Sequence, residues 1–152
     1  SKQVRKMKTI FSIISLGIIL LMASCGDPND NFDMHSPQAT IPVDTFEVNR
    51  GDIVNLTAIL TDESGVESCI LTYGKWKISE EIRLKDVGYP TSYQFTTDIV
   101  VPSDAEFSWL EDYQKHDGTI FKITQTYHKL SLTFYDAVKN KNIVYFYIKV
   151  KS

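Results

Sequence analysis

The chain has 152 residues, of which 43% are hydrophobic, 23% charged and 12% aromatic, with only 7 Gly and 5 Pro. This composition is typical of a globular protein and excludes disordered, collagen-like and polytopic membrane chains. Residues 1–24 hold four basic residues and no acidic one, so the remaining 12 basic and 19 acidic residues give residues 25–152 a net charge of about −7. This excess of acidic residues argues against nucleic acid as a partner, because phosphate contacts need Lys and Arg.

The N-terminal segment has the features of a targeting signal. Lys6 and Lys8 precede an apolar stretch from Ile10 to Met22. This stretch is shorter than the ~20 residues that cross a membrane as a helix. A basic start, a short apolar stretch and small residues behind it are typical of a secretory signal peptide. We therefore expect residues 1–24 to be a cleaved signal.

The signal ends in the sequence LMASCG at residues 21–26. This ending resembles the lipobox of bacterial lipoproteins, in which an aliphatic residue and two small residues precede the cysteine that becomes the new N-terminus. The resemblance implies cleavage before Cys25 and lipid attachment to Cys25. Acyl chains buried at ~0.8 kcal/mol per CH₂ would make the attachment to the membrane long-lived. The alternative is an uncleaved anchor helix with an incidental cysteine.

Residues 25–38 are rich in Asp, Asn and Pro and poor in aliphatic residues, which indicates a flexible tether. Their three Asp residues resemble the acidic stretch behind the lipidated cysteine of surface-exposed Bacteroidetes lipoproteins. The resemblance implies an outer-membrane protein displayed at the cell surface. A lipoprotein that faces the periplasm is the alternative.

From residue 39 onward, apolar and polar residues alternate with a period of two, which is typical of half-buried strands. The alternating segments are 52–61, 93–101, 130–135 and 143–150, and residues 66–78, as one or two strands, and 81–85 complete the expected set. Gly, Asn and Asp between these segments provide turns. The pattern predicts an all-β fold, a Greek-key β-sandwich of about seven strands over residues 39–152.

One segment departs from this period. Ser103 and Glu106 have the spacing of a helix capping box, and Phe107, Leu110 and Tyr113 follow at helical spacing. These residues predict one short helix near 104–115, in the link between two strands.

The segments together resemble a known family. The sequences VNRGDIVNLTAILTDESGV (48–66), VPSDA (101–105) and LSLTFYDAVKN (130–140), with Trp76 between the first two, are similar to the immunoglobulin-like domains of Bacteroidetes lipoproteins. The resemblance implies an immunoglobulin-like topology, in which Trp76 is expected to pack between the sheets. Members usually carry Gly before the Asn of the last turn, where this chain has Lys139. The similar positions are turn and core positions, so the resemblance implies a fold and no activity.

The sequence holds no enzyme motif that we recognise. The three histidines, His35, His116 and His128, lack the spacing of zinc ligands, and no nucleophile elbow, P-loop or dinucleotide fingerprint occurs. We therefore expect no catalytic residue, no metal, no cofactor and no enzymatic activity.

Two further groups have alternative interpretations. The turns at Asp62 and Asp136 are expected at the same end of the sandwich, where their oxygens could hold Ca²⁺, although Asx turns explain them better. With Cys25 lipidated, Cys69 has no partner in the chain, and we expect a buried free thiol that behaves as a small hydrophobic residue.

Aromatic residues form the candidate binding surface. If Phe146 faces the core, the tyrosines beside it face solvent, and we expect those of neighbouring strands to join them. This surface consists of Tyr73, Tyr135, Tyr145 and Tyr147. Trp109 and Tyr113, on the expected helix, form a second candidate platform. Such rings can stack on sugars or receive a partner protein, or they can simply stabilise the sheet by ~0.2–1 kcal/mol per cross-strand pair.

The sequence thus predicts a lipid-anchored, non-catalytic lipoprotein whose immunoglobulin-like domain binds a glycan or a protein partner. The alternative is a structural spacer or a subunit of an outer-membrane complex.

Overall fold

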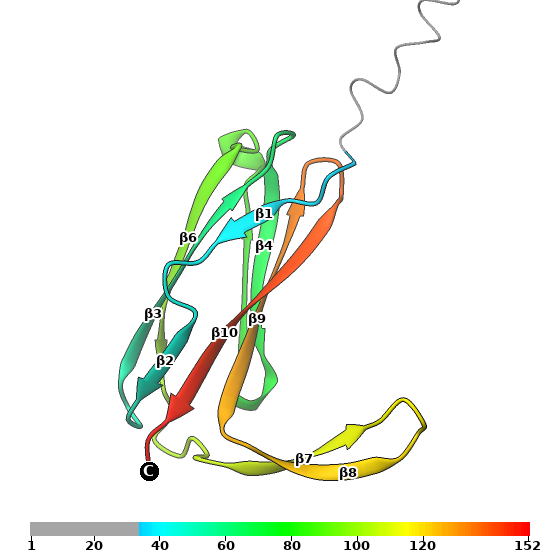
Figure 1. Cartoon of the computed structure of the whole chain (residues 1–152). Helices are drawn as coiled ribbons and strands as arrows, with labels where there is room; N and C mark the ends of the chain where they lie inside the picture. Colours follow the sequence, from blue (N-terminus) through cyan, green and yellow to red (C-terminus); the bar gives the residue numbers. More distant parts are fainter. Residues whose placement is uncertain (1–33) are drawn as a thin grey trace, which may run out of the picture. The chain divides into compact units, whose positions relative to one another are not determined.

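The alternating segments pair into two β-sheets that face each other across one core (Figure 1). The computed structural model describes residues 34–152. The first sheet has the strand order β1 (Gln38–Thr40), β3 (Ile53–Thr61), β6 (Ser92–Val100). The second has the order β2 (Thr45–Val48), β10 (Lys141–Val150), β9 (Tyr127–Asp136), β4 (Val66–Tyr73), β5 (Ile78–Arg83). A separate hairpin pairs β7 (Trp109–Gln114) with β8 (Ile120–Gln125), and the 3-10 turns η1 (Gly74–Trp76) and η2 (Lys85–Val87) follow β4 and β5.

The predicted all-β sandwich is confirmed, and the strand order agrees with an immunoglobulin-like Greek key. The chain changes sheet between β1 and β2, between β2 and β3, between β3 and β4, between β5 and β6, and again between β6 and β9. Neighbouring strands are antiparallel except for β2, which runs parallel to β10. The described chain contains ten strands instead of about seven, because β1, β2 and the hairpin add to the predicted set.

The core contains the side chains that the alternation placed there. The largest fully buried apolar side chains come from both sheets and are Leu56, Leu60, Leu71, Phe95, Leu130, Leu132, Phe134, Phe146 and Ile148. Each such burial contributes about 1.5–3 kcal/mol, so the register of every strand is strongly fixed. The residues between these positions must therefore point away from the core.

The predicted helix at 104–115 is wrong, because this segment leads into the hairpin of β7 and β8. Ser103 and Glu106 form no capping box; the backbone N–H of Ala105 donates to the carbonyl of Pro102 at 3.1 Å in a tight turn. Residues 109–114 then pair with residues 120–125, which satisfies their backbone without a helix. We call residues 109–125 the arm, because it extends sideways from one end of the sandwich (Figure 1).

Trp76 is not packed between the sheets, contrary to expectation. It ends η1, in the connection between β4 and β5, and is half-buried against the edge of the core. The segment expected as one or two strands over 66–78 is therefore a strand, a turn and the start of β5. Lys77, behind Trp76, has a left-handed φ of 55° that reverses the chain.

The predicted signal, Cys25 and most of the predicted tether lie outside the described residues. The last tether residues are held on the sandwich. The side-chain amides of Asn140 and Asn142 donate to the carbonyls of His35 and Pro37 at 3.1 and 2.9 Å. The folded domain therefore includes residues 35–38 as well as the predicted 39–152.

Candidate functional site

The outer surface of the five-stranded sheet carries the tyrosines that the sequence singled out on β9 and β10. Phe134 and Phe146 are fully buried, so their neighbours Tyr135, Tyr145 and Tyr147 project from the opposite side of the sheet, as predicted. Tyr145 keeps 37% of its surface exposed, and the other two are half-buried.

Tyr127 and two lysines belong to the same surface, although the sequence analysis did not select them. The register of β9 and β10 places Lys129 opposite Tyr147 and Tyr127 opposite Lys149. The Lys129 ammonium lies 4.0 Å from the centre of the Tyr145 ring, and the Lys149 ammonium 5.8 Å from that of Tyr127. Such contacts stabilise exposed rings by about 0.5–1 kcal/mol. We call the four residues the tyrosine face: Tyr127, Tyr135, Tyr145 and Tyr147.

Tyr73 does not belong to the tyrosine face, contrary to the sequence prediction. A bulge between Val66 and Ser68 shifts the alternation of β4 by one residue. Tyr73 therefore lies on the core-facing side of β4, together with the buried Cys69 and Leu71.

Tyr73 instead joins Trp76, Trp109 and His128 in a cluster that we call the aromatic clamp. His128 is fully buried, and its ring centre lies 4.5 Å from that of Trp76 and 4.4 Å from that of Trp109. Tyr73 stands edge-on to Trp76 at 5.3 Å, and the ammonium of Lys75 covers the Trp109 ring at 3.7 Å. Because Trp109 begins β7, the clamp fastens the arm to the sandwich.

Hydrogen bonds fix the tautomer of His128. Its Nε2 lies 2.8 Å from the carbonyl oxygen of Glu106, which can only accept, so Nε2 carries the hydrogen. Nδ1 then accepts from the Tyr73 hydroxyl at 2.6 Å. Burial lowers the pKa of His128, and nearby Lys75 adds to this effect. In Tyr73, where the charged form is the deprotonated one, burial instead raises the pKa, to about 12. The two neutral groups satisfy each other, so they provide packing and no free base.

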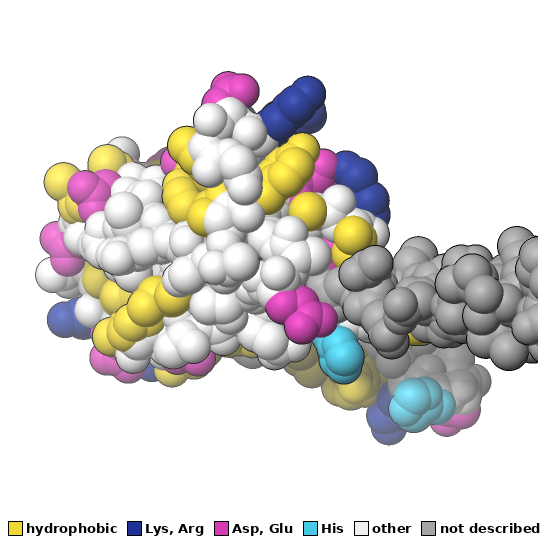
Figure 2. Space-filling view, turned by 90° about the horizontal axis from the view of Figure 1, so that it is seen from above, with side chains coloured by type: hydrophobic (Ala, Val, Ile, Leu, Met, Phe, Trp, Pro, Cys, Tyr) yellow, Lys and Arg dark blue, Asp and Glu magenta, His cyan; other side chains and the backbone are white. Residues whose placement is uncertain are grey.

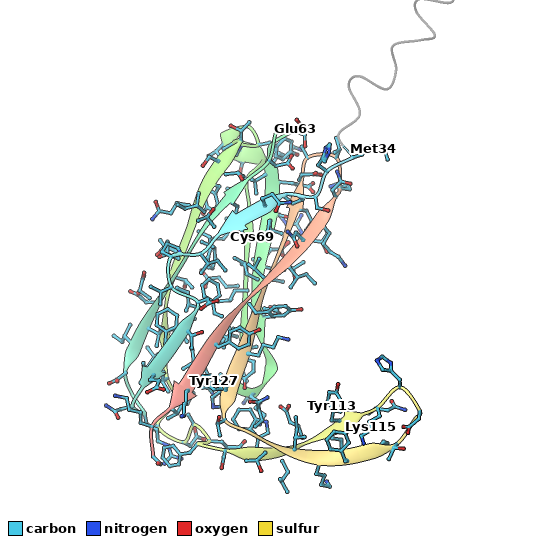
Figure 3. All side chains as sticks on the ribbon, in the orientation of Figure 1. Met34, Glu63, Cys69, Tyr113, Lys115 and Tyr127 are labelled. Atoms are coloured by element: carbon cyan, nitrogen blue, oxygen red, sulfur yellow. The ribbon has the colours of Figure 1, made fainter. Side chains whose placement is uncertain are left out.

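Trp109 and Tyr113 form the second candidate platform. They lie on one side of the arm, which is a hairpin and not the predicted helix. Tyr113 is 52% exposed and contacts Phe121 of β8, with 5.1 Å between ring centres; Figure 3 shows it far out on the arm. The other side carries Leu110 and Ile120, which are 64% and 62% exposed. The arm therefore presents apolar side chains on both sides, and a two-stranded hairpin has no core of its own.

A pocket of about 330 Å³ lies beside Tyr135 on the outer surface of the five-stranded sheet. Its floor is Ser68, which the strand register places between Tyr135 and Arg83. A short side chain between two long ones leaves a hollow in the sheet surface. The remaining lining residues are Glu67, Glu81, Lys85, Tyr89 and Lys139. Of these residues, only Tyr135 was predicted from the sequence, because the others meet only when three strands and two turns are folded together.

The turns at Asp62 and Asp136 meet at one end of the sandwich, as predicted, and a backbone hydrogen bond of 2.9 Å joins them. The Asp62 carboxylate accepts from the backbone N–H of Ser64 at 2.8 Å, and that of Asp136 from the N–H of Val138 at 3.0 Å, in each case two residues further along the chain. The Asx-turn interpretation is therefore confirmed. Figure 2 looks onto this end and shows acidic and basic side chains mixed around it. Within residues 34–152, no three His, Cys, Asp or Glu side chains are grouped to hold a metal ion.

Cys69 is the buried free thiol that the sequence predicted. It is 1% exposed and lies between the sheets (Figure 3). Burial, together with the charge of Glu80, raises its pKa to about 12. A thiol that stays protonated and covered is a poor nucleophile, so Cys69 serves the core.

No protein-family model, curated protein or solved structure matches this chain. Among the helical turns of residues 34–152, none has the length and hydropathy that crossing a membrane requires. Function is therefore inferred from the tyrosine face, the pocket and the arm.

Proposed function

We propose that the protein is a lipid-anchored lipoprotein of the outer membrane, displayed at the cell surface, and that its immunoglobulin-like domain binds a glycan without catalysis. The tyrosine face carries the glycan proposal, because four rings project from adjacent strands on one surface. Aromatic rings offer flat faces for the C–H groups of sugars. Thr133 lies between these rings on β9 and offers its hydroxyl to sugar hydroxyls, whereas the hydroxyl of its neighbour Ser131 is hydrogen-bonded to that of Thr72 at 2.8 Å.

The lysines of this surface favour a glycan over a protein. Lys129 and Lys149 stand among the rings, whereas lysine is depleted in the cores of protein interfaces. Sugars need no such dry core, because their hydroxyls hydrogen-bond to polar side chains and water.

The proposal that no reaction is catalysed rests on two observations. The sequence contains none of the catalytic motifs sought, and the two groups best suited to such a role are already engaged. Both ring nitrogens of His128 are hydrogen-bonded within the aromatic clamp, and the Cys69 thiol is buried.

The membrane part of the proposal rests on the sequence of residues 6–25. Cys25→Ala should abolish incorporation of labelled palmitate and partition into detergent, and equal labelling of variant and parent would refute the lipid anchor. Protease treatment of intact cells then tests the location. Digestion of the domain supports surface display, and survival places it inside the envelope.

Glycan binding is tested on a glycan array with the full chain in a non-ionic detergent. Tyr145→Ala should weaken binding about twofold to tenfold, since one ring contact contributes about 0.5–1.5 kcal/mol. Tyr113→Ala, an exposed tyrosine on the arm, is the matched control. A loss at Tyr113 alone would move the site to the arm, and an array without any signal would refute the proposal.

A structural role, as a spacer or a subunit of an outer-membrane complex, is the second candidate, and the arm favours it. Its apolar side chains Leu110 and Ile120 are exposed on one side, with the Lys122–Asp112 ion pair between them, and exposed apolar side chains rimmed by polar ones are typical of protein interfaces. This role predicts a stoichiometric partner in a pull-down from detergent extract. Leu110→Ser combined with Ile120→Ser should abolish the pull-down, whereas Tyr145→Ala should not affect it.

A further inference from the structure

The pocket beside Tyr135 is built from the sheet register and from one unusual feature of the backbone. Among the described residues, three non-glycine residues have a left-handed φ, and two of them line this pocket. These are Tyr89, with φ 52°, and Lys139, with φ 72°. Each such residue costs roughly 1–2 kcal/mol relative to a glycine. The chain thus keeps two side chains in the pocket wall at positions where glycine would be more stable.

The position of Tyr89 is tightly determined. A Cβ at Gly65 would collide with the Tyr89 carbonyl oxygen, so glycine is required there for the two turns to approach. The Tyr89 N–H donates to the carbonyl of Leu84 at 3.2 Å, and the next carbonyl, that of Pro90, accepts from the N–H of Val66 at 2.8 Å. The ring of Tyr89 is therefore presented by a fixed backbone.

The charges of the pocket leave one cation without a partner. Arg83 pairs with Glu81 at 3.1 Å, and Lys139 pairs with Glu67. The ammonium of Lys85 forms no ion pair within residues 34–152. Three basic and two acidic side chains thus give the pocket a net positive charge, whereas residues 34–152 as a whole hold 12 basic and 16 acidic residues. An unpaired cation beside polar donors favours an anionic group in the ligand.

We propose that this pocket binds a sugar that carries a carboxylate, with Lys85 and the outer nitrogens of Arg83 as partners of the carboxylate. The inference deepens the proposed function and rests on it. The Tyr135 ring, at the side of the pocket, packs on the face of the sugar, and the hydroxyl of Ser68 on the floor donates to it. Glu81 accepts hydrogen bonds from sugar hydroxyls, since an ionised carboxylate only accepts.

The pocket and the tyrosine face share Tyr135. Tyr135 pairs with Lys141, and Tyr145 lies four residues further along β10, about 14 Å from Lys141 at ~3.4 Å per residue. That span suits a short oligosaccharide, with its acidic unit in the pocket and a neutral unit on Tyr145. The pocket volume of about 330 Å³ lies at the lower end of ligand sites, which fits one sugar unit.

The test measures affinity for matched acidic and neutral glycans by calorimetry, using the full chain in non-ionic detergent. The pairs are trigalacturonate and its methyl ester, a hyaluronan tetrasaccharide and its carboxyl-reduced form, and 3′-sialyllactose and lactose. At least one acid should bind at least tenfold more tightly than its neutral partner. Lys85→Gln should reduce that affinity about threefold to tenfold, and Tyr135→Ala at least as much. Lys151→Gln, which removes the same charge from an exposed site outside the pocket, is the control.

The outcomes separate this inference from the proposed function. Equal affinity for acids and neutral partners, with a loss on Tyr135→Ala, would overturn the carboxylate inference and leave glycan binding standing. Equal losses from Lys85→Gln and Lys151→Gln would show attraction by net charge and overturn the pocket as the site. Binding of no member of any pair overturns the inference, and a glycan array without signal would refute the proposed function as well.

Discussion

Replacing Trp109 with alanine should release the arm while the sandwich stays folded. The indole holds the arm through two ring contacts, one with His128 at 4.4 Å and one with the Lys75 ammonium at 3.7 Å. The first contributes about 0.5–1.5 kcal/mol, the second about 0.5–1 kcal/mol at an exposed site, and burial of half the ring adds to both. The loss is therefore about 2–3 kcal/mol, and the arm has no core that could compensate.

Trypsin cleavage after Lys122 measures the opening of the arm. Lys122 lies inside β8 and pairs with Asp112 at 3.3 Å, so cleavage there requires the hairpin to open. A loss of 2–3 kcal/mol raises the open fraction roughly 30- to 150-fold, at tenfold per 1.4 kcal/mol, and the cleavage rate follows that fraction when closing is fast. Tyr113→Ala is the control, because it removes a ring from the same side of β7 and leaves the clamp intact, so cleavage should rise less than fivefold.

Two results would refute this reasoning. Cleavage of the Trp109→Ala variant at the parent rate would show that the clamp does not hold the arm. Loss of the cooperative urea transition of the sandwich in the same variant would show that arm and sandwich fold as one unit.

Three further predictions concern the core and its titrating groups. Phe146→Ala should lower the free energy of unfolding in urea melts by about 3–5 kcal/mol, because the ring is fully buried. Tyr145→Ala, on the other side of β10, should lower it by on the order of 1 kcal/mol. Equal losses would mean that both sides of β10 are covered. The lowered pKa of His128 means that the unfolded chain takes up the proton first as the pH falls through about 6.5, so stability should fall between pH 7 and 5. His128→Phe should reduce this fall and the exposed control His116→Gln should keep it, whereas an undiminished fall in His128→Phe would assign it to another group. Peptide mapping should find Cys69 labelled by a maleimide only after unfolding, since the thiol is buried and its pKa is about 12; rapid labelling of the native chain would contradict this.

The sequence was sufficient to predict which strand residues face the core wherever a local alternation of apolar and polar residues determines it. On β9 and β10 the alternation runs uninterrupted, so the buried Phe146 and the outward Tyr145 followed directly. The same alternation, continued towards the N-terminus of β9, also predicts an outward Tyr127. The prediction for Tyr73 was wrong, because the bulge between Val66 and Ser68 reverses the sides of β4 beyond Val66. The expected burial of Cys69, four residues before Tyr73 on the same strand, was the signal that Tyr73 faces the core.

The arm and the pocket depend on contacts that a local pattern does not contain. Leu110 and Tyr113 match helical spacing, yet as strand residues they point to opposite sides, and only pairing with residues 120–125 decides between the two structures. The pocket combines a residue from η2 with the left-handed Tyr89 and Lys139. A left-handed φ at a lysine or tyrosine is imposed by the surrounding fold. The glycine that the resembling domains usually carry at the position of Lys139 was a signal for it there, and Tyr89 offered none.

The two N-terminal strands determine how the domain resists tension. β1 pairs with β3 over three residues, and β2 with β10 over four. A pull along the strands, applied through the residues before β1, first separates β1 from β3 and then acts on β2. Because β2 and β10 run in the same direction, the force slides one strand along the other and strains their hydrogen bonds together instead of opening them one at a time. The domain therefore yields in two steps, a weak one at β1 and a stronger one at β2, and the sheet that bears the tyrosine face stays intact until the second.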